Sequence, residues 1–420
     1  MNIYIFEDQL SDNFLPIAYT RAVFELISGT RPILEKILSI IDNKNRISLF
    51  IRPFLKDAIQ KRYPSYPVNP SYIDDGLWIN GRMIFTLNDI KTATQNKNTI
   101  FTVNGIPAIA YLDKSHSVKF IDFENNRIKI NIPENITSQE INPFVYNYFF
   151  EIPLTTGQMI IEDFNKYYTC GTIEGIIHDN VSILNKKNIY IGKNAVIKPG
   201  TVLDAEEGPI IIEKNVIIMS NSTIIGPCYI GENSVIKIGA KIYKGCHIGK
   251  VCKIGGEVES SVFQGYSNKQ HDGFIGHSYV GEWVNIGADT NCSDLKNNYS
   301  NVKVWVNGKY VDSQSTFVGL TIADHSKTGI NTMFNTGTVV GVGCNIYGCN
   351  FPPKYIPSFT WGGAEGFTEH KFDKMINTAK IVTSRRNVQL DRIDISLLEY
   401  IYHATREERT IFIKSNEVSS

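Results

Sequence analysis

An isoleucine recurs at every sixth position through the middle of this chain, without a slip. The positions are Ile212, Ile218, Ile224, Ile230, Ile236, Ile242, Ile248 and Ile254. An α-helix repeats about every 3.6 residues and a β-strand about every two, so neither explains this period. Six residues is the step of a hexapeptide solenoid, in which each short strand forms one flat face before the chain turns a corner. The rhythm therefore predicts a β-solenoid, whose stacked coils bury a core that no single repeat could bury alone.

A small or slim side chain lies four residues after each isoleucine, which predicts one large and one small inward position per face. These side chains are Val216, Ser222, Cys228, Ser234, Ala240, Cys246, Cys252 and Val258. The phase also extends back to Ile191 and shifts by three residues around 207–209. It resumes in two later blocks, first at Phe274, Val280 and Ile286, and then at Ile322, Thr328, Phe334, Val340 and Ile346. We expect the solenoid to occupy residues 170–352, with two interruptions.

The second interruption, 291–316, is polar and contains two apolar runs on either side of Asn307-Gly308. Asn-Gly between alternating apolar runs is a signal for a type I′ β-hairpin. We therefore expect an arm that projects from the solenoid. Such an arm covers a ligand or embraces a neighbouring subunit, unless it is a surface excursion without a role.

The segments on either side of the solenoid lack its rhythm. In residues 1–165, strands are expected near Asn2–Phe6, 48–51 and 77–80, with a helix over 30–41 that has Pro32 in its first turn. Alternating strands and helices predict an α/β domain with a largely parallel sheet. The tail, 367–420, is expected to be helical, with one helix over 371–386 and another capped by Asp394.

Composition excludes several classes of partner. Lys plus Arg equals Asp plus Glu at 42 each, so no net charge attracts nucleic acid or a membrane surface. The first residues do not resemble a signal peptide, and no apolar run approaches the roughly 18 residues of a membrane-spanning helix. The seven cysteines include no CxxC pair, and four of them occupy the small inward position, which indicates core packing: Cys228, Cys246, Cys252 and Cys344. We expect a cytoplasmic protein.

The segment 271–290 is the strongest candidate for chemistry in the solenoid. His271 lies beside a coil, and a neutral imidazole can accept a proton from an amine that attacks a thioester. The alternative is that His271 and His277 are corner residues that hydrogen-bond to neighbouring loops. Asn285 and the glycine-rich turns around it would allow a substrate to lie against the backbone.

This segment resembles the acetyltransferase site of the bifunctional GlmU family, which acetylates glucosamine-1-phosphate and then uridylylates it. The matching residues are His271, Gly276, Val284, Asn285, Ile286, Gly287, Ala288 and Thr290. The resemblance implies a trimer of left-handed β-helices in which His271 is the general base. It also implies that Asn285 contacts the sugar, that Gly287 and Ala288 line the acetyl-coenzyme A site between subunits, and that Lys237 binds phosphate.

The resemblance has departures on the acceptor side. The family tyrosine three residues after the base is Phe274, and a family lysine on the sugar-phosphate side is Glu259. An acid facing an anionic sugar phosphate would repel it. The identity of the acyl acceptor is therefore not carried over from the family.

Almost the whole chain also resembles a group of shorter bacterial proteins that are similar to sugar nucleotidyltransferases. The shared motifs are KIGGEVE (253–259), SNKQHDGF (267–274), SDLKNNY (293–299), and the variant patterns at 15–21 and 29–32. The resemblance implies a Rossmann-like N-terminal domain that joins a nucleoside triphosphate to a sugar-1-phosphate.

Within that domain, Arg21 stands where the family has its catalytic lysine, and Arg31 is expected to bind phosphate as well. Glu7 and Asp8 are candidate Mg²⁺ ligands. The usual glycine-rich loop does not follow the first strand. Asn80 is expected at the substrate, next to Arg82, which falls near the family's metal aspartate. The alternatives are surface ion pairs for Arg21 and Arg31 and a turn or cap role for Asp8.

The sequence thus favours a homotrimeric sugar-1-phosphate nucleotidyltransferase that also acetylates an amino sugar with acetyl-coenzyme A. Two other classes remain open. The solenoid could be a trimerisation scaffold for nucleotidyl transfer alone, or the chain could bind a sugar nucleotide without catalysis.

Overall fold

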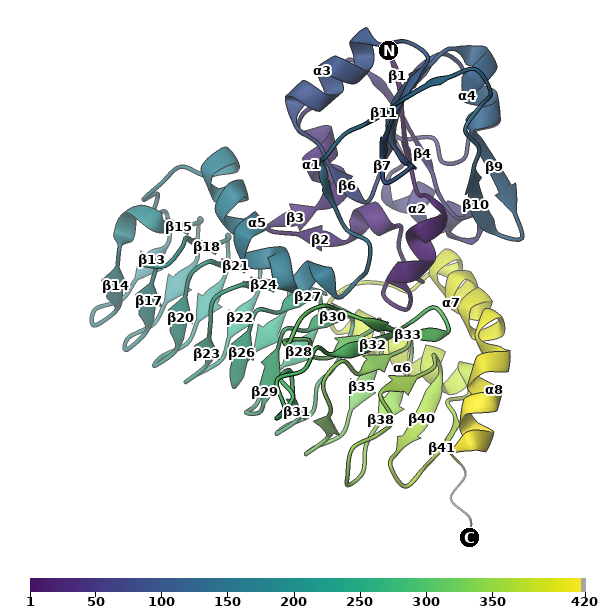
Figure 1. Cartoon of the computed structure of the whole chain (residues 1–420). Helices are drawn as coiled ribbons and strands as arrows, with labels where there is room; N and C mark the ends of the chain where they lie inside the picture. Colours follow the sequence, from purple (N-terminus) through teal and green to yellow (C-terminus); the bar gives the residue numbers. More distant parts are fainter. Residues whose placement is uncertain (417–420) are drawn as a thin grey trace. The chain divides into compact units, whose positions relative to one another are not determined.

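A computed structural model of the chain describes residues 1–416 (Figure 1). These residues divide into two compact units. Unit 1 contains Met1–Leu26, Arg31–Tyr148 and Arg392–Tyr400. Unit 2 contains Ile27–Thr30, Phe149–Asp391 and the chain from Ile401 onward.

Unit 1 is built on a six-stranded sheet, as the alternating pattern predicts. Its strands, in spatial order, are β11 (Thr137–Glu140), β7 (Thr99–Val103), β8 (Ile106–Leu112), β5 (Gly76–Asn80), β1 (Asn2–Phe6) and β4 (Arg46–Phe50). β1 pairs in parallel with both β4 and β5, and β11 pairs in parallel with β7. β8 runs antiparallel to β5 and β7. The helices of this unit are α1 (Ile33–Leu38), α2 (Lys56–Arg62), α3 (Leu87–Gln95) and α4 (Lys114–Phe120).

The sheet of unit 1 is stabilised by an aromatic cluster. All five residues of β5 are buried, and the ring of Trp78 lies 4.6 Å from that of Tyr4 and 4.9 Å from that of Phe50. Rings at these separations add to the free energy gained by burial. One prediction here is wrong in extent. The helix expected over 30–41 is only α1, because Arg31 and Pro32 form a short strand and Pro32 is the N-cap residue.

Unit 2 is a β-solenoid with three parallel faces (Figure 1). The first face contains β13 (Ile176–Ile177), β16 (Val196–Ile197), β19 (Ile217–Ile218), β22 (Val235–Ile236), β25 (Lys253–Ile254) and β28 (Asn268–Lys269). The second contains β14 (Ser182–Leu184), β17 (Val202–Asp204), β20 (Thr223–Ile225), β23 (Lys241–Ile242), β26 (Glu257–Glu259) and β29 (Phe274–Gly276). The third contains β15 (Ile189–Ile191), β18 (Ile210–Ile212), β21 (Cys228–Ile230), β24 (Cys246–Ile248), β27 (Val262–Gly265), β30 (Tyr279–Glu282), β34 (Thr321–Ile322), β37 (Val339–Val340) and β39 (Tyr355–Ile356). Later coils add β35 (Lys327–Thr328), β38 (Asn345–Ile346), β40 (Thr360–Gly363) and β41 (Gly366–Glu369), and β31 (Asn291–Cys292) pairs with β36 (Met333–Phe334).

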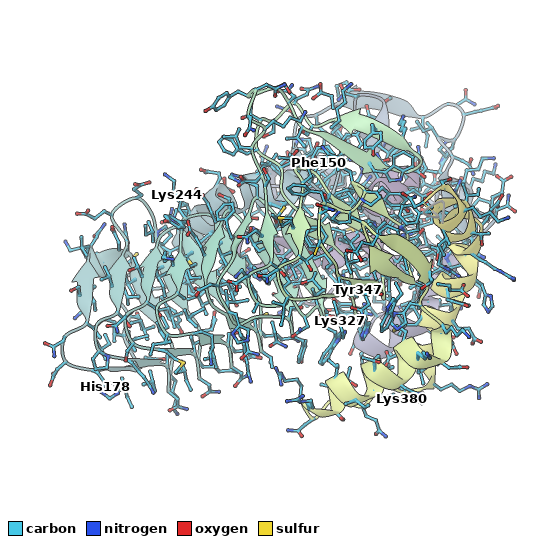
Figure 2. The ribbon with its side chains drawn as sticks, turned by 90° about the horizontal axis from the view of Figure 1, so that it is seen from below. Phe150, His178, Lys244, Lys327, Tyr347 and Lys380 are labelled. Atoms are coloured by element: carbon cyan, nitrogen blue, oxygen red, sulfur yellow. The ribbon has the colours of Figure 1, made fainter. Side chains whose placement is uncertain are left out.

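The residues that point into the solenoid explain the six-residue repeat. All eight isoleucines are buried in one continuous core with the four cysteines predicted to fill it. The corners are turned by residues with positive φ, and Asn215 links three successive coils, because its side chain accepts a hydrogen bond from Asn194 and donates one to Asn233. Asparagine tolerates the left-handed conformation that such a corner requires. Figure 2 shows the stacked strands from below, with His178 near the first coils.

One position in the resumed phase was predicted wrongly. The inward residue of β29 is Ile275, which is fully buried and pairs with Val258, whereas Phe274 is only half-buried. Ile275 follows the inward Lys269 by six residues, but the inward Val280 follows Ile275 by only five, so the corner between the second and third faces is one residue shorter than the six-residue count assumes. The residue that follows Ile254 in the first face is a lysine, Lys269.

The predicted arm is confirmed as a β-hairpin. β32 (Lys303–Val306) pairs antiparallel with β33 (Lys309–Asp312), and both Asn307 and Gly308 have positive φ. The helices of unit 2 and the tail are α5 (Glu151–Tyr167), α6 (Phe372–Ser384), α7 (Arg392–Ala404) and α8 (Arg406–Ser415). Asp394 is not a cap, because α7 begins two residues earlier and Asp394 instead pairs with Lys61 at 2.8 Å. Within residues 1–416, no helix is both long enough and apolar enough to cross a membrane.

Candidate functional site

The carboxyl ends of three parallel strands bring polar side chains together in unit 1. Glu7 and Asp8 follow β1, Arg52 follows β4, and Asn80 ends β5, with Arg82 two residues later. Parallel neighbours end at the same edge of a sheet, where open α/β sheets bind their ligands. The polar residues of this edge are therefore expected to form one site, and their contacts show how they are held.

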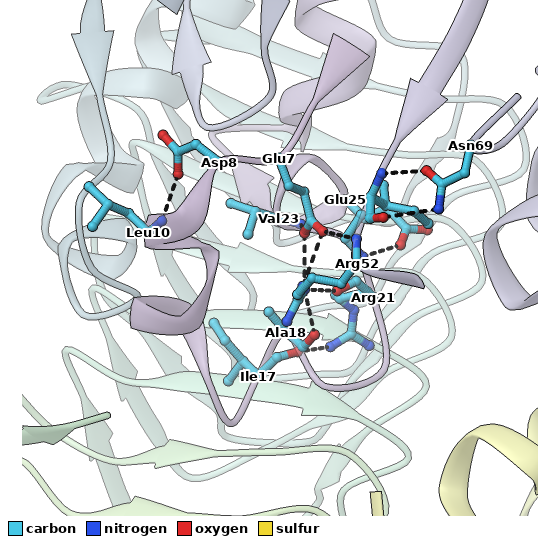
Figure 3. A network of polar contacts seen from close by, with 12 residues as sticks. Glu7, Asp8, Leu10, Ile17, Ala18, Arg21, Val23, Glu25, Arg52 and Asn69 are labelled. Carbon is cyan, nitrogen blue, oxygen red and sulfur yellow. Dashed lines mark hydrogen bonds and ion pairs between the residues drawn. The ribbon is translucent and has the colours of Figure 1, made fainter. Parts of the chain in front are cut away.

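Glu7 is bound to Arg52 in a buried two-point ion pair. Nη2 and Nε of Arg52 lie 3.0 Å from the two carboxylate oxygens of Glu7, and the backbone N–H groups of Val23 and Arg52 donate to the same carboxylate. Figure 3 shows Arg52 between Glu7 and the loop that contains Ala18 and Arg21. The backbone carbonyls of both loop residues accept from Arg52 Nη2. Glu7 therefore neutralises Arg52 and fixes its plane.

Asp8 holds a second arginine in the same way. Its Oδ2 accepts from Nε of Arg82 at 2.7 Å and from the Asn80 side-chain amide at 2.8 Å, and its Oδ1 accepts from the backbone N–H of Leu10. Asp8 is also the N-cap of a short 3-10 helix, so the cap role considered from the sequence is confirmed. Arg82 and Asp8 are both almost fully buried. The acids that follow β1 thus position two arginines.

A cavity of about 550 Å³ opens at this edge of the sheet. Arg82 lines it, together with Asn104, Asn142, Phe144 and Asn147. Arg82 donates from Nη1 to Tyr146 and Asn147, but its Nη2 is buried and has no hydrogen-bond partner among the described residues. An unmatched buried guanidinium nitrogen beside a cavity is a ready donor for an anionic group.

The two arginines predicted to bind phosphate lie elsewhere. Arg21 is buried, so it is not a surface ion pair, and its Nη1 donates to the backbone carbonyl of Ile17 at 2.9 Å. Arg31 is half-buried and precedes α1. Neither residue lines the cavity. Arg52 was missed in the sequence because its partner Glu7 is 45 residues away, whereas Arg82 was noticed for standing near the family's metal aspartate.

Glu7 and Asp8 do not fit a Mg²⁺ ion held by the protein alone. Each carboxylate is already neutralised by an arginine and accepts at least three hydrogen bonds. Among the described residues, no group of three or more His, Cys, Asp or Glu side chains is placed to hold a metal. Mg²⁺ prefers few carboxylates together with substrate phosphate oxygens.

In the solenoid, the structure brings together several of the predicted residues at the corner between the first and second faces. Asn268 pairs with Asn285, and this register, continued along the chain, places His271 beside Ala288 in the next coil. The bond from the backbone N–H of Asp289 to Asp272 confirms the register. Asn285 and His271 are exposed, and Gly287 and Ala288 are half-buried. The same column of coils contains Lys237, whose backbone N–H bonds to Ile254.

Cations gather on the first face near Lys237. The pKa of Lys253 is lowered by burial and then by the charges of Arg386, Lys237 and Arg385. Arg386 also donates from Nη2 to the Asn268 side chain at 3.2 Å. A bound anion would reduce the electrostatic repulsion among these positive charges.

Comparison with known proteins is consistent with both sites. Residues 3–169 match the family model described as "Sugar nucleotidyl transferase". These residues are therefore similar to a sugar nucleotidyl transferase domain. The cavity at the carboxyl edge, which Arg82 lines, lies within the matched residues.

Longer matches extend from this matched segment into the solenoid. The chain is 28% identical over 324 residues to the "Bifunctional sugar-1-phosphate nucleotidylyltransferase/acetyltransferase" of Sulfurisphaera tokodaii, covering 73% of this chain and 63% of that protein. The chain therefore spans less than two thirds of the length of this relative. It is 27% identical over 362 residues to the "Bifunctional protein GlmU" of Methanocaldococcus jannaschii, covering 75% and 84%. A solved UDP-N-acetylglucosamine acyltransferase from Campylobacter jejuni is 14% identical over 56% of this chain and 84% of its own, with a TM-score of 0.25.

Proposed function

We propose that this chain transfers a nucleoside monophosphate to a sugar-1-phosphate at the carboxyl edge of unit 1. A phosphate oxygen of the sugar-1-phosphate attacks the α-phosphorus, a new P–O bond forms, and the bond to the β-phosphate breaks with release of pyrophosphate. The observation that carries this proposal is Arg82, which lines the cavity and has a buried Nη2 without a hydrogen-bond partner among the described residues. The relatives named for this activity and the matched family support it.

Arg82 suits this role because its plane is fixed before substrate arrives. Asp8 holds Nε, and Tyr146 and Asn147 accept from Nη1, so Nη2 alone remains to meet a phosphate oxygen. A pre-positioned guanidinium stabilises charge that develops on a transferring phosphoryl group. Arg21 and Arg31 do not line the cavity, so we propose that they affect the reaction at most by holding the surrounding loops in place. Any Mg²⁺ is proposed to arrive on the triphosphate, and the reaction would take place where nucleoside triphosphates are supplied, in the cytoplasm.

The test is release of pyrophosphate from a panel of nucleoside triphosphates and sugar-1-phosphates. We expect Arg82→Lys to lower the rate by about 10²-fold, because lysine retains the charge but not the fixed fork. Arg46→Gln is the matched control, since Arg46 is an exposed arginine of β4. Pyrophosphate release that is unchanged in Arg82→Lys would assign the phosphate contact to another residue. A silent wild-type chain that still binds nucleotide would support the non-catalytic alternative.

A second activity, acyl transfer from acetyl-coenzyme A to an amino sugar, is favoured by the solenoid. The observation is the convergence of His271, Asn285 and Ala288 on one corner, beside the cationic face around Lys237. The resemblance gives His271 the role of base, Asn285 that of a sugar contact, and Gly287 and Ala288 the donor site. We propose a homotrimer for this activity, because the resemblance places the donor site between subunits.

Loss of thioester absorbance from acetyl-coenzyme A, followed with a panel of amino sugars and amino-sugar phosphates, tests this activity. We expect turnover by the wild-type chain and weaker acceptor binding in Lys237→Gln. The control is Lys193→Gln, at an exposed lysine of an early coil. If no acceptor is acylated while pyrophosphate is released, the solenoid is the scaffold of a nucleotidyltransferase.

A further inference from the structure

We propose that the proton acceptor for acyl transfer is His277, oriented by Asp294, and that the base of the arm assembles this pair. The inference rests on the acyl transfer proposed above and names a different residue for its central step. Nδ1 of His277 lies 2.8 Å from Oδ2 of Asp294, and the two side chains are only 16% and 12% exposed. A half-enclosed imidazole with one nitrogen on a carboxylate is the arrangement in which the other nitrogen accepts a proton.

The free nitrogen of His277 is open to a substrate. Nε2 has no hydrogen bond within the described part of the chain, and it is not among the nitrogen atoms buried without a partner. Nε2 therefore reaches solvent while Nδ1 is held by Asp294. The carboxylate selects the tautomer with hydrogen on Nδ1, which leaves the lone pair on Nε2.

The arm holds both partners of the imidazole. Asp294 lies where the arm leaves the solenoid, and Phe317 where it returns, and Leu295 bridges to Phe317 at this base. The ring of Phe317 stacks on His277 with centroids 4.9 Å apart. The backbone N–H of Gly319 donates to the His277 carbonyl, and that of Val318 to the Asp294 carbonyl. The interruption in the repeat thus supplies the carboxylate and a wall of a site.

Gly276 explains why the pair fits so closely. A Cβ atom at this position would lie 2.1 Å from Oδ2 of Asp294 and 2.6 Å from the Phe274 ring. Only glycine leaves room for the carboxylate beside His277. Phe317 is 40% exposed, so the site has an apolar surface next to the base. Such a surface suits the apolar face of a sugar ring or the acyl chain of a thioester.

His271 lacks this organisation. Its side chain is exposed, and no hydrogen bond orients it within residues 1–416. In the step we propose, the acceptor amine attacks the thioester carbonyl carbon while His277 Nε2 takes the amine proton. The C–N bond forms, the C–S bond breaks, and the imidazolium returns the proton to the departing thiolate. The products are an amide and a free thiol, so atoms and charges balance.

The test uses variants of the full chain. His277→Asn keeps a donor toward Asp294 and tolerates the φ of 44° at this position, while removing the basic nitrogen. We expect its kcat for acyl transfer to fall by roughly 10²- to 10⁴-fold with KM changed less than about twofold. Asp294→Asn should lower kcat with the protein still folded. His178→Asn, at an exposed histidine of the first coils, should leave kcat unchanged (Figure 2).

Nitrogen-15 spectra of labelled histidine provide a readout that does not depend on turnover. Wild-type His277 should show hydrogen on Nδ1 and a lone pair on Nε2, and Asp294→Asn should change this tautomer. The proposal is overturned if His277→Asn retains kcat while the wild type is active, or if wild-type His277 carries its hydrogen on Nε2. A wild-type chain that acylates no acceptor refutes acyl transfer itself, and the inference falls with it, whereas loss in His271→Ala alone refutes only the inference.

Discussion

Lys269 occupies the inward position that Ile254 occupies one coil earlier, with their Cα atoms paired in the parallel ladder of the first face. The lysine is 1% exposed, and its ammonium donates to the backbone carbonyls of Gly255 and His271 at 3.1 and 2.9 Å. Burial lowers the pKa of Lys269 to about 8. The ammonium group of Lys269 thus binds corner carbonyls inside an otherwise apolar core. Burying its charge lowers the free energy of unfolding by an amount that depends on pH.

Stability should therefore rise as Lys269 loses its proton. Its folded pKa of about 8 lies below the ordinary value of 10.5, so the folded state binds fewer protons between these values. The free energy of unfolding should increase from about pH 8 to 10.5, by about 3 kcal/mol for this group. Urea unfolding of wild type and Lys269→Met at pH 7.5 and 9.5 measures the difference. An equal pH dependence in both proteins would mean that Lys269 titrates normally.

Acid should destabilise unit 2 through His247. Its Nδ1 lies 2.7 Å from the Gly29 carbonyl, and burial lowers its pKa to about 3. The unfolded histidine titrates near 6.5, so stability is complete above that pH and falls as pH drops toward 3. At pH 4.5 the loss should be about 2–3 kcal/mol. His247→Phe should retain the stacking on Tyr229 and show a smaller loss between pH 7 and 4.5 in denaturant titrations.

Breaking the Glu7–Arg52 pair should cost far more than breaking a surface pair. Glu7→Gln leaves a buried guanidinium without its counter-charge, which should lower the free energy of unfolding by about 3–5 kcal/mol. The control is Glu124→Gln, because Glu124 and Lys129 form an exposed pair at 3.5 Å. That change should lie within about 0.5 kcal/mol of wild type. Similar losses in chemical denaturation of both variants would contradict the assignment.

The isoleucine column can be tested with two neighbouring residues of the same coil. Ile236 is fully buried, whereas Ile238 is 63% exposed. Ile236→Ala should destabilise the chain by about 2–5 kcal/mol through lost burial and a cavity, and Ile238→Ala by less than about 0.5 kcal/mol. Thermal unfolding of both variants checks this. A large loss in Ile238→Ala that depends on protein concentration would instead place this residue in a subunit interface.

Mg²⁺ should bind only together with nucleotide. Because arginines already neutralise Glu7 and Asp8, calorimetric titration of the protein with MgCl₂ alone should give no saturable heat. Titration with the magnesium complex of a nucleoside triphosphate should instead give a saturable heat of binding. Saturable binding of Mg²⁺ alone that disappears in Asp8→Asn would show that the carboxylates are metal ligands, as the sequence suggested.

Much of the fold follows from local patterns. The isoleucine period, the small positions with their four cysteines, and the Asn307-Gly308 hairpin each depend on neighbours within a few residues, and the structure confirms all three. The limits of α1 and the phase at Phe274 were predicted wrongly. A short strand before α1 and a shortened corner after Ile275 are set by tertiary pairing, which local propensity does not contain.

The sequence by itself determined the solenoid, because a six-residue repeat depends only on neighbouring side chains and the same pattern recurs in every coil. It also identified the two candidate sites, which are the residues that follow the first strand and the segment 271–290. Only the tertiary structure decided the partners: Glu7 with Arg52, Asp8 with Arg82, and His277 with Asp294. The first two contacts join residues 45 and 74 positions apart, where no sequence period links them, whereas His277 and Asp294 lie 17 positions apart, in the same register between coils as Asn268 and Asn285. Burial then gives each pair its effect, since a charge removed from water must find its partner in the fold.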